Sequence, residues 1–431
     1  MNNNNLIDDI NAGRFDGSFS TLYSREPLEF HRERWVGIIN THRERTGDSS
    51  PRLFSSPGRT ELSGNHTDHN RGRVLAAAIQ LDTIAAVSTP PEKSMIAEVV
   101  SEGYPPVRVD LSNLTKVKSE EGSTDALLRG IAASIVLRGG TVGGFSASTA
   151  SRVLKGSGLS SSAALEVLVG SIFNELYNDS RFTPVELAIM GQKAENEYFG
   201  KPCGLMDQTA CAVGGVVAID FANPKAPMVE ALNADFASAG YTLAVVDSGG
   251  DHADLTPDYA AIPEEMKAAA GEMGAEVLRD ADEESFISAI PEIRNKSGDR
   301  AVLRALHFFN ENRRVGEMVD ALNKNDIKSY LDGVRRSGDS SWRFLQNVFS
   351  PRHVDEQAVS LALALSERFL DGEGASRVHG GGFAGTIQVL VPTDKFKAYV
   401  SFMEKYFGNG SVVPLSVRPL AVGEIQKTQG R

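Results

Sequence analysis

The chain has 431 residues with 41% hydrophobic and 23% charged side chains, so it can bury an ordinary globular core, and its length favours two domains. Its formal net charge of −12 argues against a general binder of nucleic acids or membrane surfaces, because phosphate backbones and anionic lipids attract clusters of lysine and arginine. The two cysteines, Cys203 and Cys211, exclude a disulfide framework, and we recognise neither a signal peptide nor a membrane-spanning apolar run, so we expect a cytoplasmic protein.

The spacing of apolar residues predicts a mixture of helices and strands in the first half of the chain. Helices are expected where apolar side chains recur on one helical face, at 28–46, 124–137, 160–178 and 183–198. Strands are expected in segments rich in β-branched and small apolar residues, at 72–89, 97–111 (as a pair), 141–154 and 215–220.

The second half predicts longer helices followed by a compact α+β unit. The expected elements are a strand at 241–247, helices at 260–272 and 299–346, strands at 375–378 and 386–391, a helix at 394–406 and a last strand at 411–415. This ending resembles a βαβ arrangement and indicates an α+β fold. The Pro- and Ala-rich stretch at 221–240 is the expected boundary between domains at 1–225 and 226–431, and the last strands are free to return to the first domain.

A glycine- and serine-rich loop runs from Lys155 to Leu165 and reads KGSGLSSSAAL. Glycines let the backbone approach a ligand closely, and serines supply hydroxyl donors and helix caps. An amphipathic helix follows at once, and the unpaired N–H groups of its first turn favour phosphate. A plain capped turn would explain a lone Gly-x-Gly but not the full string. Because the Walker loop and the protein-kinase motifs are missing, the sequence predicts a different class of ATP-dependent kinase.

Four blocks in order resemble the galactokinases of the GHMP small-molecule kinase family. They are PGRTELSGNHTDHN from Pro57, GSGLSSSAAL from Gly156, the ENEYFG and GLMDQ pair from Glu195 to Gln208, and SRVHGGGFAG from Ser376. The resemblance covers nearly the whole chain. It implies a two-domain α/β and α+β fold, with an N-terminal domain like ribosomal protein S5 domain 2 and a C-terminal ferredoxin-like domain. ATP and a sugar would meet between these domains.

The resemblance also implies a role for each matching residue. Asp207 would be the catalytic carboxylate that orients the sugar hydroxyl and accepts its proton, and Arg59 would keep it ionised. Mg²⁺ would be held by Ser162 and Glu195, with Glu197 as a neighbouring alternative. The ATP-binding residues would be Gly156, Ser157, Gly158, Leu159, Ser160, Ser161, Ser162 and Ala163. The sugar would contact Asn65, His66, Asp68, Gly204 and Tyr259.

The sequence departs from the family pattern around the sugar motif. Asn65 stands where the family usually has Glu, expected to bind the sugar's 6-hydroxyl, and Glu61 stands where the family has Asn. Four residues of extended strand span roughly 13 Å, so we expect Glu61 and Asn65 to lie apart and to be unable to exchange roles. An amide at position 65 also removes a negative charge, so a sugar with a carboxylate at C6 would no longer be repelled.

Three functions are compatible with these residues. The first is phosphorylation of galactose by ATP, and the second is the same reaction on galacturonate, arabinose or N-acetylgalactosamine. The third is a non-catalytic sugar sensor, which Asp207, Arg59 and the intact loop disfavour. The expected partners are therefore a small sugar and ATP with Mg²⁺, without nucleic acid or membrane, and we expect a monomer.

Overall fold

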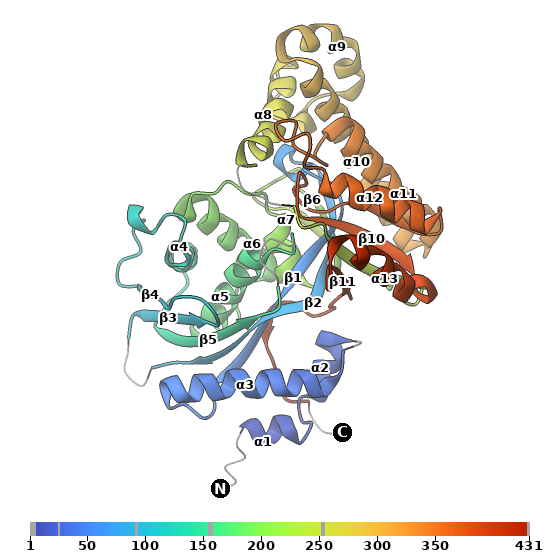
Figure 1. Ribbon diagram of the computed structural model, residues 1–431. Coiled ribbons are helices and arrows are strands. Elements are labelled where there is room, and N and C mark those ends of the chain that lie inside the picture. Colours follow the sequence, from blue (N-terminus) through green and yellow to red (C-terminus); the bar gives the residue numbers. More distant parts are fainter. Residues whose placement is uncertain (1–5, 25, 91–93, 154–157, 251–254, 429–431) are drawn as a thin grey trace.

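The computed structural model describes residues 6–24, 26–90, 94–153, 158–250 and 255–428 (Figure 1). Two β-sheets of eight and four strands organise the chain, and helices pack on both. No helix within these ranges combines the length and the apolar character that crossing a bilayer requires.

The larger sheet is built around two long paired strands. Its order is β12-β1-β2-β5-β3-β4, and β6 and β7 branch from the other end of β2. Only β3 and β5 run parallel to each other; the other pairs are antiparallel. The strands are β1 (Arg52–Ser63), β2 (Arg73–Ser88), β3 (Ile96–Ser101), β4 (Val107–Asp110), β5 (Phe145–Ser151), β6 (Val216–Asp220), β7 (Met228–Leu232) and β12 (Gly423–Glu424).

Helices cover both faces of this sheet. Side chains alternate between faces along a strand: Ile84 and Ala86 of β2 pack with Trp35 on one face, whereas Ala85 and Val87 pack with Leu128 on the other. The elements on the first face are α1 (Leu6–Asn11), α2 (Asp16–Tyr23) and α3 (Leu28–Thr46). The remaining helices of this half are η1 (Asp68–Asn70), η2 (Lys118–Glu120), α4 (Thr124–Leu137), α5 (Ser161–Tyr177), α6 (Pro184–Lys193), η3 (Ala194–Phe199) and α7 (Met206–Val213).

The smaller sheet has the order β11-β8-β10-β9 and is antiparallel throughout. Its strands are β8 (Tyr241–Asp247), β9 (Ala375–Val378), β10 (Thr386–Pro392) and β11 (Val412–Leu415). The helices α12 (Ala358–Leu370) and α13 (Phe396–Phe407), the latter preceded by η6 (Thr393–Lys395), pack with it. A strand order of 4-1-3-2, with a helical crossover before the second and fourth strands, is the ferredoxin-like arrangement expected from the sequence.

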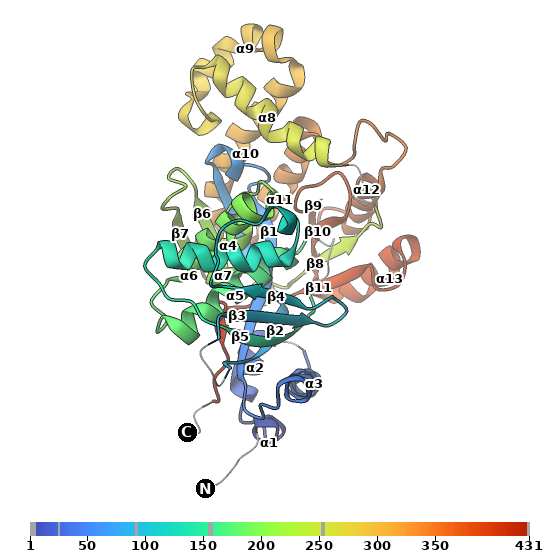
Figure 2. The ribbon, with the colours of Figure 1, turned by 90° about the vertical axis from the view of Figure 1, so that its left-hand side faces the viewer.

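A helical segment lies between β8 and α12, and its first part, residues 256–297, extends away from both sheets (Figures 1 and 2), whereas its later helices pack against them. It comprises α8 (Thr256–Glu272), η4 (Leu278–Asp280), α9 (Glu283–Ser297), α10 (Asp299–Asn323), α11 (Ile327–Ser340) and η5 (Ser341–Leu345). The single helix predicted over 299–346 is therefore interrupted. The break follows Asn323, and the side chain of Asp326 accepts a hydrogen bond from the N–H of Ser329 and starts α11.

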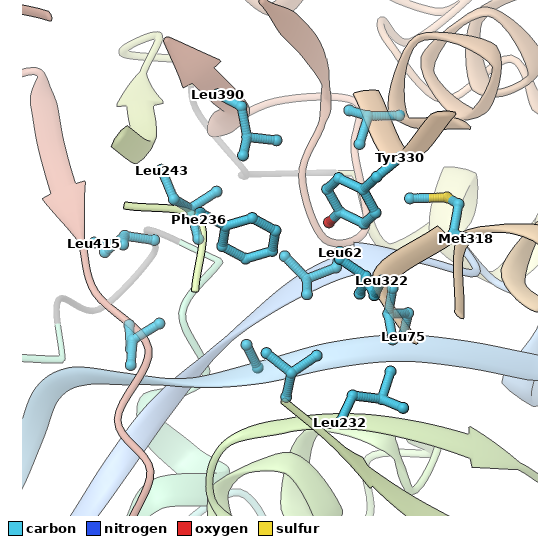
Figure 3. Packing of buried hydrophobic residues seen from close by; sticks show 14 of the residues in the cluster. Leu62, Leu75, Leu232, Phe236, Leu243, Met318, Leu322, Tyr330, Leu390 and Leu415 are labelled. Atoms are coloured by element: carbon cyan, nitrogen blue, oxygen red, sulfur yellow. The ribbon is translucent and has the colours of Figure 1, made fainter. Parts of the chain in front are cut away.

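One apolar cluster joins the two sheets (Figure 3). Leu62 and Leu75 come from the larger sheet, Leu243 and Leu390 from the smaller one, and Tyr330 from α11. The two halves are thus held together by a shared core to which β1, β2, β8, β10 and α11 contribute.

Late segments of the chain complete the larger sheet. β7 pairs with β6, so this sheet continues past residue 225, and β12 pairs with β1. Arg418 is fully buried, donates to Ser55 Oγ at 2.6 Å and lies 3.5 Å from Asp82 Oδ2. We propose that the domain boundary lies between β7 and β8.

Candidate active site

A bidentate ion pair between Asp207 and Arg59 lies at the centre of the site. Arg59 Nε donates to Asp207 Oδ1 at 2.7 Å, and Arg59 Nη2 donates to Asp207 Oδ2 at 2.6 Å. Burial raises the pKa of Asp207, but the charge of Arg59 and hydrogen bonds from Arg59 and Ser160 outweigh burial and hold that pKa below its ordinary value. The Asp207 side chain is 32% exposed, so an ionised carboxylate is accessible to a ligand.

The glycine- and serine-rich loop is attached to the same arginine. The N–H of Arg59 donates to the carbonyl of Leu159 at 3.1 Å, and Arg59 Nη1 donates to the carbonyl of Gly158. Ser160 Oγ donates to Asp207 Oδ2. β1 therefore positions Arg59 so that one residue fixes both the Asp207 carboxylate and the end of the loop.

Helix α5 begins at this point, as the sequence predicts. Ser160 is its N-cap residue with φ of 61°, and Ser161, Ser162 and Ala163 form the first turn. Ser162 is exposed, whereas Ala163 is buried. The unpaired N–H groups of this turn suit an anion. Gly156 and Ser157, predicted to bind ATP, lie outside the described residues.

Asn65 and Glu61 are in direct contact, so the expected separation of roughly 13 Å is wrong. β1 ends at Ser63, and Gly64 turns the chain with φ of 95°, which brings Asn65 Nδ2 to 3.0 Å from Glu61 Oε1. The same nitrogen donates to the carbonyl of Gly380 at 2.6 Å, and Asn65 Oδ1 accepts from Asn347 Nδ2 at 2.7 Å. Asn65 has no exposed surface, and its amide contacts protein groups only.

The carbonyls of the Gly380–Gly382 loop are held by side chains from three segments. His66 Nε2 donates to the carbonyl of Gly381 at 3.0 Å, and Asn347 Nδ2 donates to the same oxygen at 3.1 Å. Tyr259 donates through its hydroxyl to the carbonyl of Gly382 at 2.9 Å. Burial lowers the pKa of His66 to about 3, so a neutral imidazole makes this contact at neutral pH. His66 and Tyr259, predicted from the sequence to bind the sugar, thus meet at this loop.

Asp68 and Gly204 face each other closely. A Cβ atom on Gly204 would lie 1.7 Å from Asp68 Oδ2, so only glycine allows this approach. Asp68 Oδ1 accepts a hydrogen bond from the N–H of His69 at 3.0 Å. Because Gly204 is three residues before Asp207, the contact joins the segment after β1 to the segment that carries Asp207.

Glu195 points into the protein and Glu197 points out. Glu195 is 4% exposed, and its Oε2 accepts a hydrogen bond from Gln208 Nε2 at 2.9 Å. Glu197 is exposed, and its Oε2 lies 3.8 Å from Lys193 Nζ. Gln208 Nε2 also donates to Glu166 Oε2 at 2.9 Å. Burial, with a contribution from Glu195, raises the pKa of Glu166 well above its ordinary value.

The donor set near α5 fits Mg²⁺ bound together with ATP phosphates. Within the described residues, no group of three or more His, Cys, Asp or Glu side chains is arranged to hold a metal ion. Mg²⁺ needs few protein ligands when phosphates complete its shell, and it prefers carboxylate oxygens. Buried Glu195 and the exposed hydroxyl residue Ser162 supply oxygens of this kind, and Glu166 Oε1 is buried without a hydrogen-bond partner among the described residues.

Several residues of the site carry no recognisable sequence signal. His307 comes from α10 and Asn347 follows η5, and His307 Nε2 donates to the carbonyl of Asn65 at 2.9 Å. Buried His379, by contrast, lies within the SRVHGGGFAG block, and its Nδ1 lies 3.0 Å from Thr386 Oγ1. Gln208 does have a signal, because it directly follows Asp207 in the GLMDQ motif.

Comparison with known proteins gives a consistent family assignment. The family described as galactokinase galactose-binding signature matches residues 40–89, and the family described as GHMP kinases N terminal domain matches residues 126–215. The galactokinase of Glaesserella parasuis serovar 5 is 30% identical over 361 residues, which cover 82% of this chain and 88% of that protein. A galactokinase of Actinobacillus pleuropneumoniae is 29% identical over 357 residues, with the same coverage of 82% and 88%.

Solved structures show the same fold. The structure of Lactococcus lactis galactokinase complexed with galactose has a TM-score of 0.74 and 23% identity, and the match covers 91% of this chain and 99% of that one. A mevalonate kinase from Methanococcus jannaschii has a TM-score of 0.59 and 14% identity, with 85% and 98% of the two chains covered.

Proposed function

Because the chain belongs to the galactokinase family of the GHMP kinases, we propose that it transfers the γ-phosphoryl group of ATP to the 1-hydroxyl of galactose. The products are galactose 1-phosphate and ADP. The observation that carries this proposal is the ionised, accessible Asp207 paired with Arg59 at the start of α5. The Asp207 carboxylate therefore lies beside the N-terminus of α5, where backbone N–H groups favour the binding of phosphates.

Asp207 orients the sugar hydroxyl and accepts its proton. The hydroxyl oxygen then bonds to the γ-phosphorus as the bond from that phosphorus to the bridging oxygen of ADP breaks. Arg59 holds both carboxylate oxygens, so Asp207 cannot rotate away, and its guanidinium offsets negative charge that spreads over the transferring group.

The loop at 156–163 and the first turn of α5 bind the phosphates of ATP. The Ser160 hydroxyl donates a hydrogen bond to Asp207 and so fixes the position of the loop relative to the carboxylate. When bound, Mg²⁺ neutralises charge on the β- and γ-phosphates. Ser162 and Glu195 are the residues that would hold it.

We propose that the sugar lies among Asp68, His66, Gly204 and Tyr259. Of these, His66 and Tyr259 contact the glycine loop, and Asp68 contacts Gly204 in the segment that leads to Asp207. Asn65 belongs to the same set, but its amide is already bonded to protein groups, so we propose that it shapes the sugar site from behind. A cytoplasmic location and a monomeric state stay predictions from the sequence.

A sugar panel tests the proposed function. Initial rates of ADP release should be measured with ATP, Mg²⁺ and each of galactose, galacturonate, arabinose and N-acetylgalactosamine. We expect galactose to have the highest kcat/KM, and chelation of Mg²⁺ by EDTA to stop the reaction. No turnover of galactose beside rapid turnover of another sugar would assign that sugar as the substrate, and no turnover of any sugar would support a sensor.

Replacing Gly204 should impair sugar use more than ATP use. In Gly204→Ala the new methyl group must displace the Asp68 carboxylate. A misplacement of about 1 Å at a reacting site costs up to a hundredfold, so we expect kcat/KM for galactose to fall by up to about that factor. Steady-state kinetics with each substrate varied in turn measures the effect. The control is Gly37→Ala in α3, where nothing lies within 4 Å of the added Cβ. Equal kinetics for both variants would contradict the role of the contact.

A further inference from the structure

Two buried carboxylates lie side by side behind the start of α5. Glu166 is 1% exposed and Glu195 is 4% exposed. Gln208 Nε2 donates to an oxygen of each at 2.9 Å, so both carboxylates converge on one amide nitrogen. Burying two like charges together is costly unless a cation or a set of donors compensates them.

The described residues supply too few donors for this cluster. Glu166 Oε1 and Gln208 Oε1 are buried acceptors without a hydrogen-bond partner in the described part of the chain. Lys201 has a side chain that is 65% exposed, and its Nζ lies 3.6 Å from Glu195 Oε1. Arg59 is already engaged by Asp207. Buried oxygens in folded proteins nearly always have a partner, such as a protein donor, an ordered water or an ion.

Helix α5 connects this cluster to the phosphate end of the site. Ser162 and Glu166 are four residues apart in α5, so they lie on the same helical face one turn from each other. Glu166 is deeper, since Ser162 is exposed. A cation near Ser162 and Glu195 is therefore flanked by Glu166 on the protein side.

We propose that Glu166 is a second carboxylate ligand of the Mg²⁺ site, acting with Ser162 and Glu195. This inference rests on the proposed function, because the cation is the one that accompanies ATP. The three side chains supply hard oxygen ligands, and ADP or ATP phosphates and water complete the shell. Gln208 Nε2 binds one oxygen of each carboxylate, which leaves Glu166 Oε1 for the cation.

The test is Mn²⁺ binding in the presence of ADP, followed by electron paramagnetic resonance, because carboxylate sites that suit Mg²⁺ also take Mn²⁺. Glu166→Gln keeps the size of the side chain and an oxygen for Gln208 Nε2, but it removes the charge. We expect the Kd for Mn²⁺ to rise about tenfold or more. The melting temperature, and ADP affinity measured in EDTA, should stay at wild-type values. Glu175→Gln on the same helix, where the carboxylate faces Arg52, is the matched control.

An unchanged Mn²⁺ affinity in Glu166→Gln would overturn the proposal, as would a loss of ADP affinity in EDTA equal to the loss of Mn²⁺ affinity. If Glu166→Gln does not fold, Glu166→Asp gives the same test, because it keeps the charge but withdraws the oxygens from the cation. Galactose phosphorylation by the wild-type protein is assayed separately. Failure of that assay with Mn²⁺ binding still dependent on Glu166 would reject the proposed function and leave the metal ligand in place.

Discussion

Asp207→Asn should lower kcat by about 10²–10⁴-fold, the range over which a positioned general base contributes. An asparagine side chain fits the same space, but its amide nitrogen cannot accept the sugar's proton, and Arg59 loses the charge that it pairs with. The measurement is kcat with saturating ATP and galactose. Asp207 also accepts a hydrogen bond from Ser160, a bond that an asparagine oxygen can keep. We therefore expect the KM for ATP to change less than kcat.

The control for this variant is Asp220→Asn. Asp220 is another arginine-paired carboxylate, with hydrogen bonds from Arg73 at 2.7 Å and from Arg279 at 2.9 Å. In the larger sheet Asp220 lies opposite Arg73 of β2, five residues before Ala78, which lies opposite Arg59. It should retain wild-type kcat. If Asp207→Asn keeps wild-type activity, the catalytic assignment is wrong. The low pKa of Asp207 adds a pH criterion: the carboxylate stays ionised down to the ordinary value of about 3.9, so no loss of activity above that pH should come from its protonation.

Arg377→Met should lower the free energy of unfolding by about 3–5 kcal/mol, the cost of leaving one partner of a buried ion pair alone. Arg377 Nη2 lies 2.6 Å from Glu61 Oε1, and the two side chains are 0% and 3% exposed. Burial raises the pKa of Glu61 and Arg377 opposes that rise, so without Arg377 the carboxylate is left uncompensated. Urea denaturation followed by tryptophan fluorescence measures the change.

Two further variants make this prediction specific. Arg336→Met removes an exposed pair with Glu317, in which the side chains are 51% and 45% exposed, and it should cost no more than about 1 kcal/mol. The double variant Glu61→Gln with Arg377→Met removes both charges and should be more stable than Arg377→Met alone. Equal stability of Arg377→Met and Arg336→Met would show that the buried pair is not a stabilising contact between β1 and β9.

The parts of the site that follow a local rule could be predicted from the sequence. The start of α5 is read from a serine cap followed by an apolar helical face, and the structure has α5 beginning at Ser161. Family blocks placed Asp207 with Arg59, which are 148 positions apart and form a bidentate pair. The ferredoxin-like second sheet was implied by the family resemblance, and the alternation of strands and helices predicted after Tyr241 agrees with the observed strand order.

Contacts set by a single backbone turn or by distant packing could not be predicted. An extended strand would hold Glu61 and Asn65 apart. In the structure Gly64, with φ of 95°, reverses the chain, and the two side chains form a hydrogen bond. Asn347 reaches the glycine loop only because η5 ends beside it, and nothing in its neighbouring residues indicates that position. The break between α10 and α11 was also missed. The apolar pattern continues through it, and a single residue, the capping Asp326, starts the new helix.

The late strand β12 and buried Arg418 have a consequence for synthesis on the ribosome. The hairpin of β1 and β2 emerges early, but its outer edge is covered by Gly423 and Glu424, and the Asp82 carboxylate on β2 meets Arg418 only when the last part of the chain appears. At roughly 5–20 residues per second, the intervening chain takes on the order of tens of seconds to translate. During that time the nascent first domain carries an open strand edge, and its larger sheet is completed only after β12 has been translated.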